Sequence, residues 1–291
     1  MITAEQFTAP GRPTLAYDVY DDLGEPGPPP LVLLHGGTAD CSSWADLAAN
    51  VATERRVLVP DLRGHGESDR APGDYDLAHF TADIEAFVEQ VAGQPAVVAG
   101  HSLGAMVAAH LASSRPDLVD GAFLIDPPIY IGSEGFDSMG FAAFFPLLQQ
   151  LLNDFRARQG TLVELVELMR AMPNAFGDGG TLGESFSEEH LVRAATAWIR
   201  FDTSVLDDLD STWDAYDPSV AVACPVHLLR AEHVPAFPAE HEARFVATHP
   251  NATVELVEGT THLIPVERPD RVLAALRAFL ARCPVERAGA K

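Results

Sequence analysis

Short, nearly continuous apolar runs recur along most of the chain, separated by amphipathic or small-residue segments. Such runs are typical of strands that are buried on both faces of a parallel sheet. Their alternation with helical segments predicts an α/β fold in which helices cover that sheet. The predicted strands are Leu31–Leu34, Arg56–Val59, Ala96–Ala99, Gly121–Ile125, Val226–Leu229 and Thr253–Val257. The predicted helices cover 42–52, 78–92, 103–114, 238–248 and 266–282, after an antiparallel hairpin over 5–20.

The alternation stops between residues 128 and 218, where no segment has the pattern of a strand. Thr161-Leu-Val-Glu164 has the form of a capping box and predicts the start of a helix. A second helix is predicted over 187–201. We therefore expect a sheet core formed by 1–127 and 219–291, and a helical lid formed by 128–218.

The predicted lid is rich in large apolar side chains. It holds eight of the fifteen phenylalanines and three of the five methionines. These side chains have two interpretations: a small core of the lid itself, or the apolar wall of a pocket between lid and sheet. On the second interpretation we expect Phe136, Phe141 and Met169 to contact the substrate. Residues 176–180 are expected to form a flexible connector.

Composition and charge exclude several classes of partner. The chain has 291 residues and a net charge of −23, so nucleic acid and anionic membrane surfaces would repel it. No apolar run approaches the ~18 residues of a membrane span, and the first residues lack the pattern of a signal peptide. Three scattered cysteines, Cys41, Cys224 and Cys283, are too few for a disulfide framework or a zinc site. We expect buried thiols and a reducing cytoplasm.

The segment Gly100-His-Ser-Leu-Gly104 lies between a predicted strand and a predicted helix. A serine at such a sharp turn exposes its hydroxyl at the carboxyl edge of the sheet, and flanking side chains larger than glycine would collide with the backbone. Ser102 is therefore the candidate nucleophile. The alternative is a serine in an ordinary glycine-flanked turn.

A serine hydroxyl needs a base, and His262 follows the last predicted strand, at the same sheet edge as Ser102. His101 is adjacent to Ser102, but successive strand residues point to opposite faces, which argues against it as the base. The amide groups of Gly37 and Leu103 are the candidate oxyanion donors. Gly36 and His101 are expected to contact the substrate. The alternative for His262 is a surface-loop histidine.

Four segments together resemble the α/β-hydrolase superfamily in order and spacing: His35-Gly-Gly37, Asp61–Ser68, Gly100–Gly104 and Gly259–His262. The resemblance runs from about residue 14 to 282, apart from the lid. It implies a mostly parallel sheet flanked by helices, with an inserted α-helical lid. It also implies a structural role for the loop Asp61–Ser68. A metal site formed by His35, Asp61 and His65 is the competing idea for those residues.

One element departs from the superfamily pattern. Most members carry the acid of the triad after the seventh strand, where this chain has Val234, and valine cannot orient a histidine. A minority carry it after the sixth strand, where Gly121–Ile125 is followed by Asp126. We expect Asp126 to be the acid, since neighbouring strands are only ~5 Å apart. Glu232 is the alternative acid, and Asp126 alternatively forms a turn before Pro127.

These residues predict acyl transfer to water through an acyl-serine, with Ser102 as nucleophile, His262 as base and Asp126 as acid. The expected substrate is a small to medium hydrophobic ester or lactone, with no cofactor and no metal. Cleavage of a C–C bond in a diketone is the enzymatic alternative, and a non-catalytic small-molecule receptor is the other. Haloalkane dehalogenases and epoxide hydrolases are disfavoured because their nucleophile is an aspartate.

Overall fold

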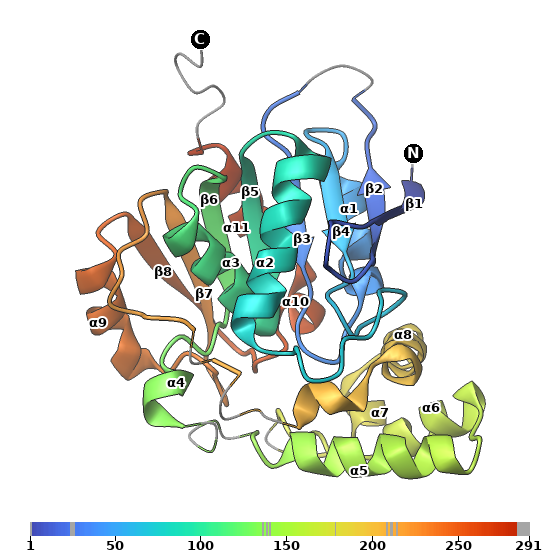
Figure 1. The fold of residues 1–291 in the computed structure, drawn as a ribbon. Coiled ribbons are helices and arrows are strands. Elements are labelled where there is room, and N and C mark those ends of the chain that lie inside the picture. Colours follow the sequence, from blue (N-terminus) through green and yellow to red (C-terminus); the bar gives the residue numbers. More distant parts are fainter. Residues whose placement is uncertain are drawn as a thin grey trace.

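The computed structural model describes residues 2–23, 27–135, 137, 139, 141–177, 179–207, 209, 212–213 and 215–283. Eight strands form one sheet in the order β1-β2-β4-β3-β5-β6-β7-β8 (Figure 1). The strands β1 and β2 are antiparallel to their neighbours, and the other six are parallel, as predicted. Their bounds are β1 Ile2–Phe7, β2 Leu15–Tyr20, β3 Leu31–Leu34, β4 Val57–Pro60, β5 Ala96–His101, β6 Val119–Ile125, β7 Val226–Ala231 and β8 Ala252–Val257.

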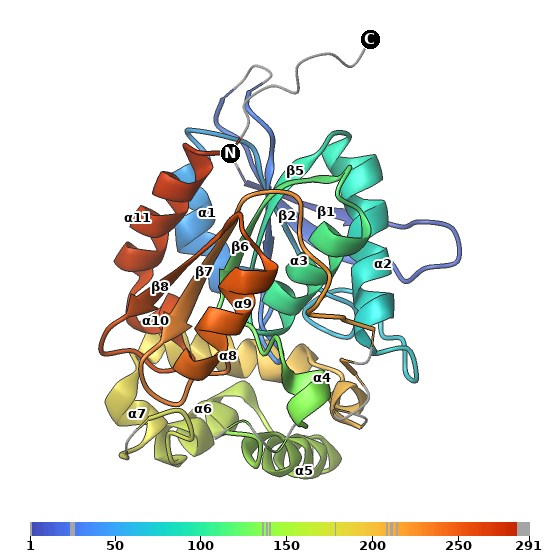
Figure 2. The same cartoon turned by 90° about the vertical axis from the view of Figure 1, so that its left-hand side faces the viewer.

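Helices cover both faces of this sheet (Figure 2). The helices α1 (Ala45–Val51) and α11 (Pro269–Leu280) pack on one face. The other face is covered by α2 (Leu77–Phe87), α3 (Leu103–Ser114) and α9 (Glu242–Thr248). A short helix α10 (Ile264–Glu267) precedes α11, and a π-helical turn over Val88–Ala92 extends α2.

The side chains of β3 show why the apolar runs are nearly continuous. Leu31 and Leu33 belong to the core under α1 and α11, whereas Val32 and Leu34 belong to the core under α2 and α3. All four are at most 1% exposed, so successive residues are buried although they point to opposite faces. This double burial is the physical basis of the pattern that predicted the parallel sheet.

Residues 128–218, which lie between β6 and β7, are named here the helical insertion. It contains α4 (Ile131–Glu134), α5 (Phe144–Ala157), α6 (Leu162–Ala171), α7 (Leu182–Ser185) and α8 (Glu188–Arg200). Among its described residues the only β pairing is an isolated bridge between Pro173 and Thr181. The capping box at Thr161 and the second predicted helix are both confirmed. Figure 1 shows α5, α6, α7 and α8 below the lower edge of the sheet.

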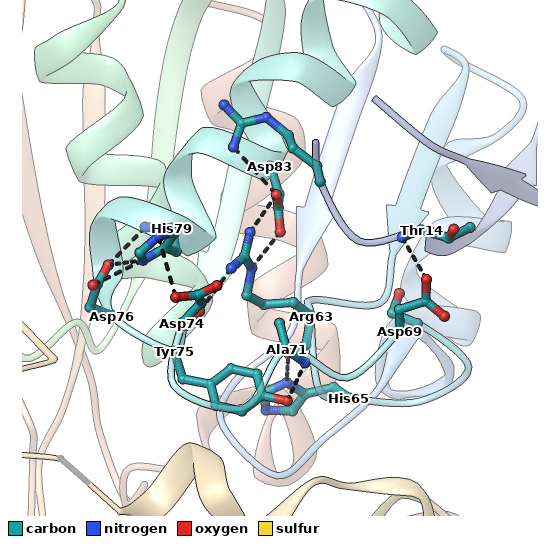
Figure 3. A network of polar contacts seen from close by, with 12 residues as sticks. Thr14, Arg63, His65, Asp69, Ala71, Asp74, Tyr75, Asp76, His79 and Asp83 are labelled. Atoms are coloured by element: carbon teal, nitrogen blue, oxygen red, sulfur yellow. Dashed lines mark hydrogen bonds and ion pairs between the residues drawn. The ribbon is translucent and has the colours of Figure 1, made fainter. Parts of the chain in front are cut away.

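Polar contacts join the helical insertion to the loop after β4. The hydroxyl of Tyr75 donates to Oδ2 of Asp202 at 2.7 Å, and the amide of Asp202 donates to the Gly64 carbonyl at 2.7 Å. The loop is itself held by a buried pair in which Arg63 donates to both oxygens of Asp83, at 2.6 and 2.7 Å (Figure 3). The insertion is therefore hydrogen-bonded to a loop of the core that the Arg63–Asp83 pair holds in place.

In the ranges that the structure describes, every helix is too short or too polar to cross a lipid bilayer. The three cysteines are free thiols, of which Cys283 is buried and the other two are half-buried. The cytoplasmic location stays a prediction.

Candidate active site

The turn between β5 and α3 has the strained geometry predicted for Gly100–Gly104. Ser102 has a φ of +51°, which L-residues rarely adopt, and its amide donates to the Ile125 carbonyl of β6 at 3.0 Å. A Cβ at Gly100 would collide with main-chain atoms of Gly104, and a Cβ at Gly104 would collide with the Leu34 carbonyl. The two glycines are therefore required by close backbone approach, and the turn places Ser102 at the N-terminus of α3.

His262 and Asp126 are brought together from two distant loops. The Nδ1 atom of His262 lies 2.7 Å from Oδ2 of Asp126, and both side chains are buried. Asp126 follows the last residue of β6 and has a φ of +43°, while His262 lies in the loop between β8 and α10. Since the carboxylate accepts, Nδ1 carries the hydrogen and Nε2 is the ring atom free to accept a proton.

The loop after β7 supplies backbone donors to this carboxylate instead of an acid of its own. The amides of Ala236 and Phe237 donate to Asp126 at 2.8 and 3.2 Å. Val234, at the position where most family members carry the acid, has a φ of +46°. The alternative acid, Glu232, accepts a hydrogen bond from the Gly259 amide at 2.7 Å, and its side chain is 42% exposed.

His101 lines the same cavity as Ser102. Its Nε2 donates to the His262 carbonyl at 2.8 Å, and the two rings are 4.7 Å apart. Burial, together with the neighbouring His262, lowers the pKa of His101 to about 3, so the ring is neutral and keeps the His262 loop in place.

A cavity of about 360 Å³ lies between the sheet edge and the helical insertion. Of the residues predicted at the site, those that line it are Gly36, Gly37, His101, Ser102, Met169 and His262. Phe141 is not part of this lining; its ring stacks on His262 instead, with centroids 4.6 Å apart and planes inclined by 24°. Phe136 lies outside the described residues.

The two candidate oxyanion donors have free amides. Gly37 lines the cavity, and Leu103 is the first residue of α3. Within the described part of the chain, neither amide donates a hydrogen bond to another group. The dipole of α3 also favours negative charge at the Leu103 end.

Several residues of the cavity were not predicted. The rings of Trp44, Phe176 and Trp198 line it, and Phe176 also stacks over His262 at 5.9 Å, although it belongs to the expected connector. The excess of phenylalanine in the helical insertion was the available signal for Phe176. Trp44 and Trp198 carried no comparable signal, because a single tryptophan in a helix is usually a core residue.

One wall of the cavity is charged. Asp46 and Glu189 contribute carboxylates, and Arg193 lies between them, with guanidinium contacts of 3.5 Å to Asp46 and 3.0 Å to Glu189. Arg193 also donates to the Ser42 carbonyl at 3.0 Å. The positive charge on this wall is therefore already neutralised by protein groups.

The loop after β4 has the structural role that the resemblance implied. Asp61 accepts hydrogen bonds from the amides of Cys41 and Glu67, at 2.6 and 2.9 Å. The Nδ1 of His35 pairs with the Gly36 carbonyl, and its Nε2 accepts the Leu62 amide at 3.0 Å. Both ring nitrogens of His35 are thus used by the main chain, which argues against the metal site considered for His35, Asp61 and His65.

Comparison with known proteins gives full-length relatives that are hydrolases. A lipase of Mycobacterium tuberculosis is 27% identical over 285 residues, covering 88% of this chain and 95% of the relative. A 2-(acetamidomethylene)succinate hydrolase of Mesorhizobium japonicum is 25% identical over 266 residues, covering 89% of this chain and 91% of the relative. Among solved structures, an enol-lactonase from Burkholderia xenovorans has the same fold, with a TM-score of 0.72 at 19% identity, covering 96% of this chain and 100% of that one.

The model of one family matches residues 31–275, which include the predicted nucleophile, acid and base. The strand order, the turn at Ser102 and this match all lead to the same assignment. The chain belongs to the alpha/beta hydrolase family.

Proposed function

We propose that this protein is a serine hydrolase that cleaves a small to medium, uncharged carboxylic ester or lactone through an acyl-serine intermediate. The observation that carries the proposal is the hydrogen-bonded pair His262–Asp126. The ring of His262 lines the same cavity as Ser102, which lies at the strained turn between β5 and α3. A serine, a histidine and a carboxylate in this order are the parts that acyl transfer needs.

In the proposed mechanism, Ser102 attacks the carbonyl carbon while Nε2 of His262 takes the hydroxyl proton. Asp126 holds the ring in the required tautomer and stabilises its charged form. The amides of Gly37 and Leu103 donate to the oxyanion. His262 then protonates the leaving alcohol. In the second half of the reaction, Nε2 takes a proton from the water that attacks the acyl-serine, and returns this proton to Oγ of Ser102 as the acid leaves.

The charge on the cavity wall favours an uncharged substrate. Asp46 and Glu189 compensate Arg193, so among the described lining residues no guanidinium is free to pair with a substrate carboxylate. The dicarboxylate named for the Mesorhizobium relative is therefore not the substrate that we propose. The acidic wall also repels the carboxylate product, which favours its release.

The size and the lining of the cavity support a short acyl chain. Its volume of about 360 Å³ is at the lower end of the range for small-molecule sites. Aromatic rings of the helical insertion line the cavity together with Ser102. We propose that the insertion acts as a lid that shields the acyl-enzyme from bulk water.

A fluorophosphonate probe tests the chemistry directly. We expect covalent labelling of Ser102, identified by peptide mass spectrometry, and loss of the label in Ser102→Ala. Ser43→Ala is the matched control, because Ser43 lines the same cavity without the strained turn. An unlabelled wild-type protein would support the receptor alternative.

A substrate panel then separates the enzymatic alternatives. p-Nitrophenyl esters of increasing chain length, γ- and δ-lactones and vinylogous diketones are compared by kcat/KM. We expect esters or lactones to be preferred. A higher kcat/KM for the diketones would identify a C–C bond hydrolase instead.

A further inference from the structure

The phenyl ring of Phe141 packs directly on the imidazole ring of His262. The two ring centroids are 4.6 Å apart and the planes are inclined by 24°. Rings that are this close and this nearly parallel touch through their faces. Phe141 belongs to the helical insertion, between α4 and α5, whereas His262 belongs to the core. One face of the proposed base is therefore covered by a side chain of the insertion.

Phe141 lies behind the site rather than in it. Its side chain is buried, and it is not a lining residue of the cavity of about 360 Å³, named here the first cavity, which Ser102 and His262 line. A substrate in the first cavity meets Ser102 and His262 but not Phe141. Any influence of Phe141 on the reaction must therefore pass through the His262 ring.

The hydrogen bond to Asp126 does not by itself fix the plane of the His262 ring. It holds Nδ1 at 2.7 Å from the carboxylate, but hydrogen bonds tolerate some tilt, and the second side-chain torsion of histidine has a broad energy minimum. A turn of the ring plane moves Nε2, the atom that takes the proton of Ser102 in the proposed mechanism. A flat ring packed on the imidazole face opposes this turn.

The Phe141 ring is itself held in place by other rings of the insertion. Its centroid lies 4.9 Å from that of Phe176 and 6.1 Å from that of Phe145. From the core, the ring of His101 also contacts the His262 ring, with centroids 4.7 Å apart and planes inclined by 39°. The imidazole is therefore packed between aromatic groups of both parts of the chain.

We propose that Phe141 is a positioning residue, whose stacked ring fixes the plane of the His262 imidazole and so directs Nε2 toward Ser102. This inference rests on the proposed function, in which His262 is the base. It gives the helical insertion a second role. Besides lining the first cavity, the insertion orients a group of the catalytic centre.

Steady-state kinetics of Phe141→Met test the role in the reaction. Methionine fills most of the space of the phenyl ring but has no flat face. With p-nitrophenyl acetate, and per serine labelled by the fluorophosphonate probe, we expect kcat to fall about 10- to 100-fold. KM should change less than about twofold, because Phe141 does not line the first cavity. Phe141→Tyr keeps a ring and should restore most of kcat.

Phe155→Met is the matched control. Phe155 is a buried phenylalanine of α5 in the same insertion, and it does not line the first cavity. Its variant should keep the kcat of the wild type. Equal losses in Phe141→Met and Phe155→Met would overturn the proposal, as would a Phe141→Tyr variant as slow as Phe141→Met.

Proton NMR in a Ser102→Ala background tests the positioning without using the reaction. The resonance to follow is the Nδ1 proton that His262 donates to Asp126, assigned by its loss in His262→Gln. Phe141→Met should exchange this proton with water about three- to tenfold faster, because the ring plane is less restrained. An unchanged exchange rate would overturn the positioning role alone. An unlabelled wild-type protein in the fluorophosphonate experiment would instead overturn the proposed function.

Discussion

Nδ1 of His262 lies 2.7 Å from Oδ2 of Asp126, a residue 136 positions earlier that follows β6 rather than β7. The loop after β7 lies beside this pair and contributes amides from Ala236 and Phe237. Asp126 and these two donors thus come from the loops that follow neighbouring strands. This arrangement makes the role of Asp126 directly testable.

Asp126→Asn should lower kcat by up to ~10⁴, because the amide favours the wrong tautomer of His262 and cannot stabilise its charged form. Glu232→Gln is the matched control and should keep nearly full activity, since Glu232 pairs with the Gly259 amide. Steady-state kinetics with the best ester of the panel measure both. The reverse result would identify Glu232 as the acid.

Ala194→Phe should narrow the substrate range. Ala194 lines the first cavity on α8, so a phenyl ring there occupies space that a longer acyl chain needs. We expect the ratio of kcat/KM for p-nitrophenyl octanoate to that for the acetate to fall at least ~10-fold. Val192→Phe adds a ring to the exposed side of the same helix and should leave the ratio unchanged. Equal ratios in both variants would mean that the acyl chain binds elsewhere.

The free energy of unfolding should decrease as the pH falls, because His65 is buried in its neutral form. Burial, and secondarily His35, lowers the pKa of His65 to about 3, whereas an unfolded histidine titrates near 6.5. Between these values the unfolded state binds the extra proton, so the stability contributed by neutral His65 is present above 6.5 and is lost as the pH falls towards 3. The expected loss is about 1.4 kcal/mol per pH unit.

Urea unfolding at pH 7.5 and pH 5.0 measures this effect. His65→Asn retains a donor for the Arg63 carbonyl, with which His65 Nδ1 pairs at 2.9 Å, and should reduce the pH dependence by about 2 kcal/mol over that interval. His233→Asn, at a side chain that is 60% exposed, should not. An unchanged pH dependence in His65→Asn would show that His65 binds protons equally in the folded and unfolded states.

Asp83→Asn should destabilise the fold by about 3–5 kcal/mol, because it leaves the buried Arg63 guanidinium without its counter-charge. Both side chains of this pair are 3% exposed. Glu54→Gln breaks the pair with Arg277, whose side chains are 42% and 43% exposed, and should cost at most about 1 kcal/mol. The comparison is made by denaturant unfolding at pH 7. Similar losses in the two variants would contradict the assigned importance of burial.

The sheet and the turn at Ser102 could be predicted because local rules determine them. Strands buried on both faces give apolar runs, and a Cβ at Gly100 or Gly104 would strike the main chain. The meeting of His262 with Asp126 was also predictable, because parallel strands end at one edge of the sheet. In each case a short sequence segment contains most of the information that determines the local structure.

The walls of the first cavity could not be predicted in the same way. Phe141 and Phe176 are both phenylalanines of the helical insertion, yet only Phe176 lines the cavity. The difference depends on how the insertion helices pack against the core, which no local pattern records.

The donors that hold Asp126 are main-chain N–H groups, which every residue except proline carries. Side chains at 236 and 237 can therefore be exchanged without removing these hydrogen bonds, provided that proline is not introduced. An alignment of the loop after β7 with a residue pattern would not detect these donors, because the main chain and not the side chains makes the hydrogen bonds. Hydrolases with this arrangement are recognised by two structural features. A carboxylate directly follows one strand, and a neighbouring loop directs its main-chain N–H groups toward that carboxylate.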